Sequence, residues 1–363
     1  MAKKIIIAGG GTGGHIFPAI AIANAIKKMA PDTEFLFVGA KGKMEMEKVP
    51  EAGYRIMGIT IAGLNRSSWH KNISLPFKLF KSYFEVKSIF KYFPPDAVIG
   101  VGGYSTLPVL RTAQLRGIPT FIHESNSFAG KANVWLGKKA TKIFVASDGM
   151  QPFFPIEKIM VTGNPVRSEI ASSEISRQEG LSYFGLEENK TTLLVMGGSL
   201  GAKSINDAIA HQLETFKDQG LQLIWQTGKT NAAQYQHKAE GFKQVWVSPF
   251  IRDMQLAYAA ADLVISRSGA MAVTEICVTG KPAIFVPFPF AAEDHQTYNA
   301  MQLVNHDAAI LVKDGDAKKD LVQTAIKLSN DTETMKRFSA NCKRLAIKNA
   351  DQIIATEILK HLS

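Results

Sequence analysis

Short runs of apolar residues alternate with longer stretches of helical periodicity along almost the whole chain. In the first half, the apolar runs that end in glycine or polar residues are 3–8, 34–38, 54–59, 97–101, 120–122 and 142–145. The pattern restarts in the second half with the runs 191–196, 221–226, 244–247, 262–266 and 283–287. Runs of this length indicate buried strands, and the segments between them have room for helices. The sequence therefore predicts an α/β protein made of two doubly wound, Rossmann-like units in series.

The boundary between these units is expected near residues 162–167, where Gly163, Asn164 and Pro165 interrupt regular structure. The predicted organisation is an N-terminal unit over 1–163 and a C-terminal unit over 164–340. Residues 329–362 have helical periodicity and room for two helices. The last helix, within 341–363, is the segment that we expect to pack back on the N-terminal unit.

Three of the predicted strands run directly into a glycine-rich loop. The loops read Gly-Gly-Gly-Thr-Gly-Gly-His at 9–15, Gly-Val-Gly-Gly-Tyr-Ser at 100–105 and Gly-Gly-Ser-Leu-Gly-Ala at 197–202. Glycine lets backbone N–H groups approach a ligand closely, and the N-terminus of the following helix favours an anion. One such loop is as well explained by a tight turn between strand and helix. Three of them, all at the carboxyl ends of strands, indicate contact with phosphate or pyrophosphate.

Two common phosphate-binding classes fit these loops poorly. Gly9, Gly11 and Gly14 have the dinucleotide-binding spacing, but the second strand ends in Val38-Gly39-Ala40 with no carboxylate for the ribose. A P-loop requires Gly-Lys-Ser/Thr, and Ala202 interrupts its nearest approach at 201–204. The sequence thus disfavours two functions, that of a nicotinamide-dependent enzyme and that of a P-loop kinase.

Composition and charge narrow the setting in which the protein works. Its 363 residues carry a net charge of +10, which predicts an anionic partner. Cys277 and Cys342 are far apart and match no metal-ligand spacing, so neither a disulfide framework nor a zinc site is expected. No signal peptide and no membrane-spanning apolar run are visible, which predicts a cytoplasmic protein.

Half of the net positive charge, +5 of +10, lies in one aromatic segment, residues 64–95. Its basic residues are Arg66, Lys71, Lys78, Lys81, Lys87 and Lys91, and Glu85 is its only acid. Phe77, Phe80 and Phe84 share one face of the predicted helix. A basic, aromatic amphipathic helix is typical of contact with an anionic membrane surface. The alternative is a core-facing helix with solvated lysines, and without a nucleic-acid-binding motif we expect no nucleic-acid partner.

The ordered set of motifs resembles one family, the MurG glycosyltransferases of peptidoglycan synthesis. Besides the three glycine loops, the matching segments are 123–126 (His-Glu-Ser-Asn), 163–167 (Gly-Asn-Pro-Val-Arg), 266–270 (Ser-Arg-Ser-Gly-Ala) and 294–300 (Asp-His-Gln-Thr-Tyr-Asn-Ala). The resemblance implies a GT-B fold, in which two Rossmann-like domains face a cleft. It also implies inverting transfer of N-acetylglucosamine from its UDP form to the muramyl sugar of undecaprenyl-pyrophosphoryl-muramyl-pentapeptide, which gives lipid II. It implies no cofactor, and a peripheral position on the cytoplasmic face of the membrane.

The resemblance also assigns roles to residues, and each residue type suits its role. The catalytic candidates are His15 and Glu124. The donor-binding candidates are Thr12, Gly13, Gly14, Asn126, Arg167, Ser199, Ile251, Ala270, Met271, Ala272, Val273, Thr274, Glu275 and Gln296. The candidates for contact with the acceptor or its pyrophosphate are Gly102, Gly103, Tyr104 and Ser105. Leu200 departs from the polar glutamine that many family members carry, so only a backbone role is expected there.

Some of these assignments leave alternatives open. His15 suits a general base that a helix N-terminus keeps neutral, but it also suits a residue that fixes its loop. Glu124 can be the base, orient His15 or bind the acceptor. Glu275 can accept hydrogen bonds from the ribose hydroxyls or complement its helix dipole. The competing functions are another glycolipid transferase, a UDP-sugar epimerase and a non-catalytic nucleotide-sugar-binding protein.

Overall fold

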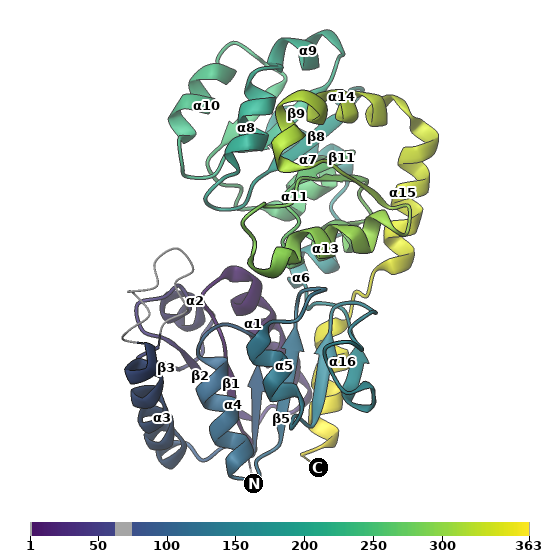
Figure 1. Ribbon diagram of the computed structural model, residues 1–363. Helices are drawn as coiled ribbons and strands as arrows, with labels where there is room; N and C mark the ends of the chain where they lie inside the picture. The colour runs from purple at the N-terminus through teal and green to yellow at the C-terminus, as the bar shows by residue number, and fades with distance from the viewer. Residues whose placement is uncertain (1, 62–74, 363) are drawn as a thin grey trace. The chain divides into compact units, whose positions relative to one another are not determined.

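The computed structural model describes residues 2–61 and 75–362, which fall into two compact units. The first unit combines Met1–Arg167 with Ile347–Ser363, and the second is Ser168–Ala346. Figure 1 shows the chain coloured from the N-terminus to the C-terminus. Each unit is an open parallel sheet covered by helices, as the sequence predicts.

The sheet of the first unit has seven parallel strands in the order β3-β2-β1-β4-β5-β6-β7. The strands are β1 (Lys4–Ala8), β2 (Glu34–Ala40), β3 (Ile56–Ile59), β4 (Ala97–Gly100), β5 (Thr120–Glu124), β6 (Lys142–Val145) and β7 (Ile159–Val161). Because β1 lies between β2 and β4, the strand order reverses there. Open α/β sheets bind ligands beyond the carboxyl ends of the strands at such a reversal.

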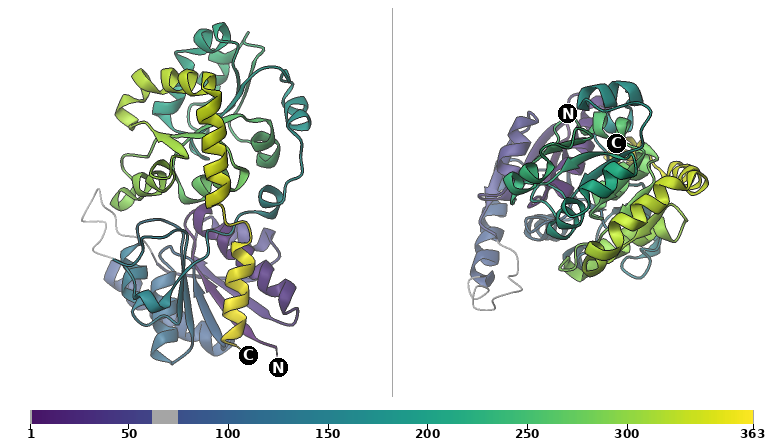
Figure 2. Two further views of the ribbon diagram at one scale, coloured as in Figure 1. Left: turned by 90° about the vertical axis from the view of Figure 1, so that its right-hand side faces the viewer. Right: turned by 90° about the horizontal axis from the view of Figure 1, so that it is seen from above.

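Alternate residues of β1 point to opposite faces of this sheet, and both faces are buried. Ile5 and Ile7 pack against α1 (Gly13–Met29) and α16 (Ala350–Lys360), which lie side by side. The left view of Figure 2 shows α16 in yellow along the sheet. Ile6 belongs to the opposite core, under the helices α3 (Leu75–Tyr92), α4 (Thr106–Leu115) and α5 (Lys131–Gly137). A shorter helix, α2 (Glu45–Glu51), follows β2.

The second unit repeats the plan with six parallel strands in the order β10-β9-β8-β11-β12-β13. The strands are β8 (Thr192–Met196), β9 (Gln222–Gln226), β10 (Val245–Ser248), β11 (Leu263–Ser266), β12 (Ala283–Phe285) and β13 (Ala309–Leu311). The helices are α6 (Ser168–Ala171), α7 (Arg177–Phe184), α8 (Lys203–Ala210), α9 (Leu213–Asp218), α10 (Ala232–Ala239), α11 (Met254–Ala260), α12 (Ala270–Thr279), α13 (His295–Val304), α14 (Ala317–Asn330) and α15 (Thr332–Leu345). The reversal of strand order lies between β8 and β11.

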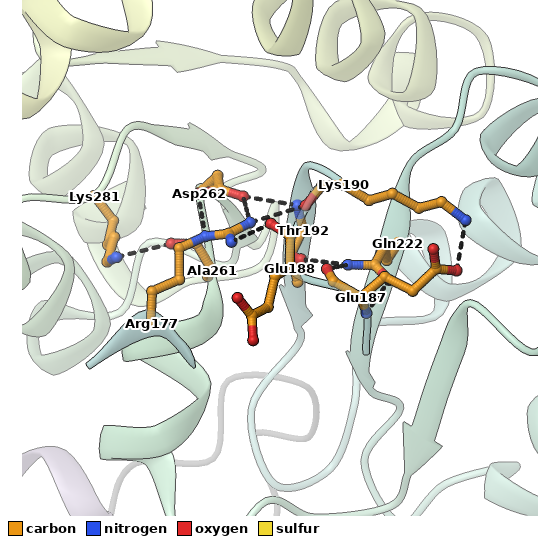
Figure 3. A network of polar contacts seen from close by, with 9 residues as sticks. All are labelled: Arg177, Glu187, Glu188, Lys190, Thr192, Gln222, Ala261, Asp262 and Lys281. Carbon is orange, nitrogen blue, oxygen red and sulfur yellow. Dashed lines mark hydrogen bonds and ion pairs between the residues drawn. The ribbon is translucent and has the colours of Figure 1, made fainter. Parts of the chain in front are cut away.

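A polar network fastens α7 to the amino ends of β8 and β11 (Figure 3). The Arg177 guanidinium donates two hydrogen bonds to Asp262, at 3.0 and 2.8 Å, and others to the carbonyls of Glu188 and Lys190. Asp262 also accepts the Thr192 N–H at 2.9 Å. The network therefore secures the amino ends of these strands. The third glycine loop begins at the other end, after the carboxyl end of β8.

No helix in the described part of the chain combines the length and the apolar character needed to cross a bilayer.

Candidate functional site

The first two glycine loops meet at the point where the strand order of the first sheet reverses. The Gly10 N–H donates to the Gly102 carbonyl at 3.2 Å, which joins the loop after β1 to the loop after β4. Gly102 and Gly103 have φ values of +93° and +88°. A Cβ on Gly103 would lie 2.4 Å from the Gly10 oxygen. These positions therefore require glycine, because the two backbones touch.

His15 lies in the first turn of α1, against both loops. Its Nδ1 lies 3.0 Å from the Gly10 carbonyl oxygen and 3.3 Å from Oγ1 of Thr12, the N-cap residue of α1. A Cβ on Gly102 would lie 2.7 Å from both Cδ2 and Nε2 of the imidazole. The second loop thus leaves room for the ring only because Gly102 has no side chain. Gly13 and Gly14 are the first two residues of α1.

Glu124 is buried at the end of β5 and organises the loop that follows it. One carboxylate oxygen accepts from the backbone N–H and the side-chain amide of Asn126, at 3.1 and 3.2 Å. The other accepts from the Gly130 N–H at 3.0 Å and from Asn133 Nδ2 at 2.9 Å. Both carboxylate oxygens are thus engaged by donors of the segment that follows β5. This geometry favours a positioning role for Glu124, with Asn126 held in place by it.

Three further candidates of the first unit lie around these loops. Tyr104 is exposed, whereas Ser105 is buried at the end of the second loop. Arg167 places its guanidinium 5.8 Å from the ring centroid of Phe17, two residues after His15. A cation is therefore held beside the first turn of α1.

His123, next to Glu124, is fully buried on β5. Burial, with a smaller contribution from the nearby His15, lowers its pKa to about 4. The side chain is therefore neutral at physiological pH. The sequence gives no signal for this burial, because only the fold distinguishes His123 from an exposed histidine.

The third glycine loop lies at the reversal in the second sheet. A Cβ on Gly201, where φ is +87°, would lie 2.2 Å from the Thr227 carbonyl oxygen, so the loop packs tightly on the end of β9. The Lys229 N–H donates to the Ser199 carbonyl at 3.1 Å. Ser199 and Leu200 are exposed at its tip. The exposed Leu200 side chain is consistent with a backbone role for this position.

The loop after β11 flanks the same reversal and leads into α12, whose N-cap is Gly269. Its first six residues are the candidates Ala270, Met271, Ala272, Val273, Thr274 and Glu275. The Glu275 carboxylate is buried and accepts the Tyr258 hydroxyl at 3.1 Å. A helix dipole acts most strongly within the first turn, and Glu275 is the sixth residue of α12. Complementing the helix dipole therefore explains the position of Glu275 poorly.

Ile251 and Gln296 are fixed by contacts within the second unit. The Ile251 N–H donates to Gln226 Oε1 at 3.0 Å. Gln296 accepts the Phe288 N–H at 3.0 Å through its side-chain oxygen, which leaves the NH₂ end of the amide as the donor for a ligand. The Ile251 N–H is therefore engaged by Gln226, whereas the Gln296 side chain keeps a donor end.

Arg267 holds the loop after β11 in place, a role that sequence analysis did not assign. Its guanidinium donates to the carbonyls of Val286 and Pro287, to Asp314 at 2.6 Å and to Ser204 at 3.1 Å. The Arg267-Asp314 pair is largely shielded from solvent. The partners lie on three separate segments, so spacing along the sequence gives no signal for this network.

The exposed side of α3 forms a separate surface. Phe77, Phe80 and Phe84 are 77%, 68% and 53% exposed, so the aromatic face that sequence analysis identified is turned to solvent. Val86 and Phe90 fill the buried side instead. Arg66 and Lys71 of the basic segment lie outside the described residues. We call the exposed residues Phe77, Phe80, Phe84, Lys81 and Lys87 the α3 surface.

Comparison with known proteins agrees with this geometry. Residues 5–145 match the glycosyltransferase family 28 N-terminal domain, and residues 192–354 match the C-terminal domain of that family. The chain is 49% identical over 360 residues to the UDP-N-acetylglucosamine–N-acetylmuramyl-(pentapeptide) pyrophosphoryl-undecaprenol N-acetylglucosamine transferase of Phocaeicola vulgatus, covering 98% of this chain and 96% of the relative. The chain belongs to the MurG family.

Solved structures agree with the MurG assignment. The crystal structure of MurG from Acinetobacter baumannii is 29% identical, covers 99% of both chains and superposes with a TM-score of 0.81. The UDP-GlcNAc 2-epimerase of Neisseria meningitidis superposes with a TM-score of 0.67 at 12% identity, which reflects the shared fold alone. The GT-B fold class predicted from the sequence is thus confirmed.

Among the described residues, no cluster of histidine, cysteine and carboxylate side chains has the geometry to hold a metal ion.

Proposed function

We propose that the protein transfers N-acetylglucosamine from UDP-N-acetylglucosamine to the muramyl sugar of undecaprenyl-pyrophosphoryl-N-acetylmuramyl-pentapeptide. The observation that carries the proposal is 49% identity, over nearly the full length of both chains, to a transferase with that name. The reaction needs a base for the acceptor hydroxyl and donors for the departing pyrophosphate. It needs no covalent intermediate on the protein.

In this proposal His15 is the general base. The acceptor hydroxyl oxygen bonds to the anomeric carbon while the bond from that carbon to the UDP oxygen breaks, and UDP leaves with the electron pair. The hydroxyl proton passes to His15 Nε2. A direct attack of this kind inverts the anomeric centre. Thr12, Gly13, Gly14 and Asn126 would contact the donor sugar, and Gly102, Gly103, Tyr104 and Ser105 the acceptor.

The second unit would bind the nucleotide. The buried carboxylate of Glu275, which accepts the Tyr258 hydroxyl, is suited to accept hydrogen bonds from the ribose hydroxyls. The residues at the start of α12 would lie along the uridine, with Ile251 at the uracil edge. Ser199 would donate to the pyrophosphate and Arg167 would add a positive charge. Gln296 would donate its amide hydrogens to the sugar hydroxyls.

We further propose that the α3 surface holds the protein on the cytoplasmic face of the membrane. Exposed phenylalanines can enter the interface between head groups and acyl chains, and lysines are attracted to anionic lipids. Lys87 lies 5.5 Å from the Phe84 ring centroid, so charge and apolar area lie together on this helix. A lipid-linked acceptor would be met at that surface.

The test is UDP release from UDP-N-acetylglucosamine, with and without a short-chain analogue of the lipid acceptor. The proposal predicts release that depends on the acceptor. A UDP-sugar epimerase would convert the donor without any acceptor, and a binding protein would release no UDP. Either of those results would overturn the proposal.

A further inference from the structure

A buried carboxylate lies directly under the first glycine loop. Glu45, the first residue of α2, is 1% exposed. A Cβ on Gly10 would lie 2.3 Å from its carboxyl carbon, and a Cβ on Gly39 would lie 2.4 Å from its Cγ. Glycine at both positions thus makes room for this side chain. Strand β2 itself ends at Ala40 without a carboxylate, but Glu45, five residues later, places its carboxylate beside the end of β2.

Both oxygens of Glu45 accept backbone N–H groups. Oε2 accepts the Gly11 N–H at 2.8 Å, and Oε1 accepts the Ala40 N–H at 2.9 Å. The carboxylate therefore ties the loop after β1 to the end of β2. Hydrogen bonds from N–H groups to a carboxylate are stronger than those between neutral groups.

The Gly11 N–H belongs to the same peptide group as the Gly10 carbonyl, which contacts His15 Nδ1 at 3.0 Å. Glu45 thus holds one end of the Gly10-Gly11 peptide, and His15 contacts the other. A carbonyl oxygen can only accept, so this hydrogen bond requires the proton on Nδ1. A neutral imidazole in that tautomer carries its lone pair on Nε2. A negative charge at the N–H end also polarises the peptide and strengthens the bond at its oxygen.

We propose that Glu45 is a positioning residue that fixes the Nδ1–H tautomer of His15 through the Gly10-Gly11 peptide. The catalytic part of this inference rests on the proposed function, in which Nε2 of His15 takes the acceptor proton. Glu45 does not touch the reacting atoms in this account. It selects which nitrogen of the base is able to accept, and it holds the ring through the loop.

The first test is the ¹⁵N NMR spectrum of the histidine side chains of the wild-type protein at pH ~8, where an ordinary imidazole is neutral. The His15 signals are assigned by their loss in His15→Ala. We expect a protonated Nδ1 and an unprotonated Nε2. An Nε2–H tautomer of His15 in the wild-type protein would overturn the inference, and this measurement needs neither turnover nor a variant of Glu45.

The second test is Glu45→Gln, compared with Glu47→Gln as the matched control. Glu47 lies on the same helix, with its side chain 71% exposed. A glutamine can accept only one of the two N–H groups, because its NH₂ end is a donor. We expect kcat to fall by roughly 10–100-fold with little change in the KM for the donor, and the Nε2–H tautomer of His15 to gain population. Glu47→Gln should match the wild-type protein in both readouts.

A folded Glu45→Gln protein with the wild-type tautomer and kcat would overturn the inference. A loss of activity without a change in tautomer would also do so, because it would reduce Glu45 to a structural residue. If Glu45→Gln does not fold, the wild-type tautomer decides. Absence of acceptor-dependent UDP release by the wild-type protein would instead defeat the proposed function, which is a separate result.

Discussion

Contacts with Gly10, Thr12 and Gly102 help to define the position of His15. The Gly10 carbonyl and the Thr12 hydroxyl lie near Nδ1, and the backbone of Gly102 lies against the opposite edge of the ring. Such contacts suit a base whose ring must keep one orientation during proton transfer. Glu124, in contrast, accepts four hydrogen bonds, three from the loop that follows it and one from Asn133 of α5.

His15→Ala should therefore lower kcat by roughly 10²–10⁴-fold with little change in affinity for UDP. Steady-state kinetics and UDP titration measure the two quantities. Glu124→Gln should do less to the chemical step than to the order of the loop that carries Asn126. A loss below about tenfold in His15→Ala would remove His15 from the role of base.

Glu275→Ala should weaken use of the donor, mostly through KM, because ribose contacts persist from the ground state to the transition state. The expected loss is on the order of 1–3 kcal/mol, as for hydrogen bonds to a charged group. Tyr258→Phe is the matched control, since it removes the hydroxyl that contacts the Glu275 carboxylate and keeps the carboxylate. Unchanged affinity for UDP in a folded Glu275→Ala protein would place the nucleotide elsewhere.

His123 makes stability depend on pH. Its folded pKa of about 4 lies below the ordinary value of 6.5, so the unfolded chain binds more protons between these values. The free energy of unfolding should therefore fall as pH decreases from about 6.5 towards about 4, by about 3 kcal/mol from this group. Urea unfolding across that range, compared with His123→Gln, measures the contribution. If the free energy of unfolding depends on pH in the same way in the wild-type protein and in His123→Gln, the predicted contribution of His123 is contradicted.

The residues of the candidate site divide into those that the sequence reveals and those that it does not. His15, Glu124 and Glu275 lie at strand ends or after glycine turns, and both of these features can be predicted from the sequence. Glu45 and Arg267 act through contacts with segments far along the chain, which appear only after folding. Their partners are mostly backbone groups, and a backbone group leaves no mark on residue identity.

At the scale of elements, the predicted strands are confirmed because apolar runs in a parallel sheet are buried on both faces. The sequence did not predict β7 and β13, which have three residues each and lie at sheet edges. Such strands need few apolar residues, so their pattern is too short to detect. For α3, the sequence left the direction of the aromatic face open, and the structure shows it exposed.

Changing Lys78, Lys81 and Lys87 of α3 together to glutamate should release the protein from anionic vesicles. Each basic residue near such a surface contributes about 1 kcal/mol, so reversing three should lower partitioning by several orders of magnitude at low salt. Vesicle sedimentation measures the binding, and the effect should shrink as salt screens the charges. Turnover of a soluble acceptor analogue should be unchanged.

The matched control is the same charge change on α14, made at Lys318, Lys319 and Lys327, which are exposed in the second unit. This variant should keep its binding to vesicles. Normal binding by the α3 variant would mean that the α3 surface is not the membrane contact. Loss of turnover of the soluble analogue would instead place these lysines at the acceptor itself.

At the scale of the molecule, each of the two units carries glycine loops where its strand order reverses. The first unit holds the proposed base, and the second holds the proposed nucleotide site. Similar architecture in a UDP-sugar epimerase shows that fold alone does not select the reaction. Assignment to the MurG family rests instead on identity that extends over nearly the whole chain.

The most direct test of the proposed transfer is the structure of its product. The purified protein is incubated with UDP-N-acetylglucosamine labelled in the sugar and with the lipid-linked muramyl-pentapeptide, and the lipid fraction is examined by mass spectrometry and NMR. We predict that the label enters the lipid only when protein and acceptor are both present, as a β-glycoside of the muramyl sugar formed by inversion of the α-linked donor. Label that stays in the nucleotide fraction, or an α-linked product, would contradict the account.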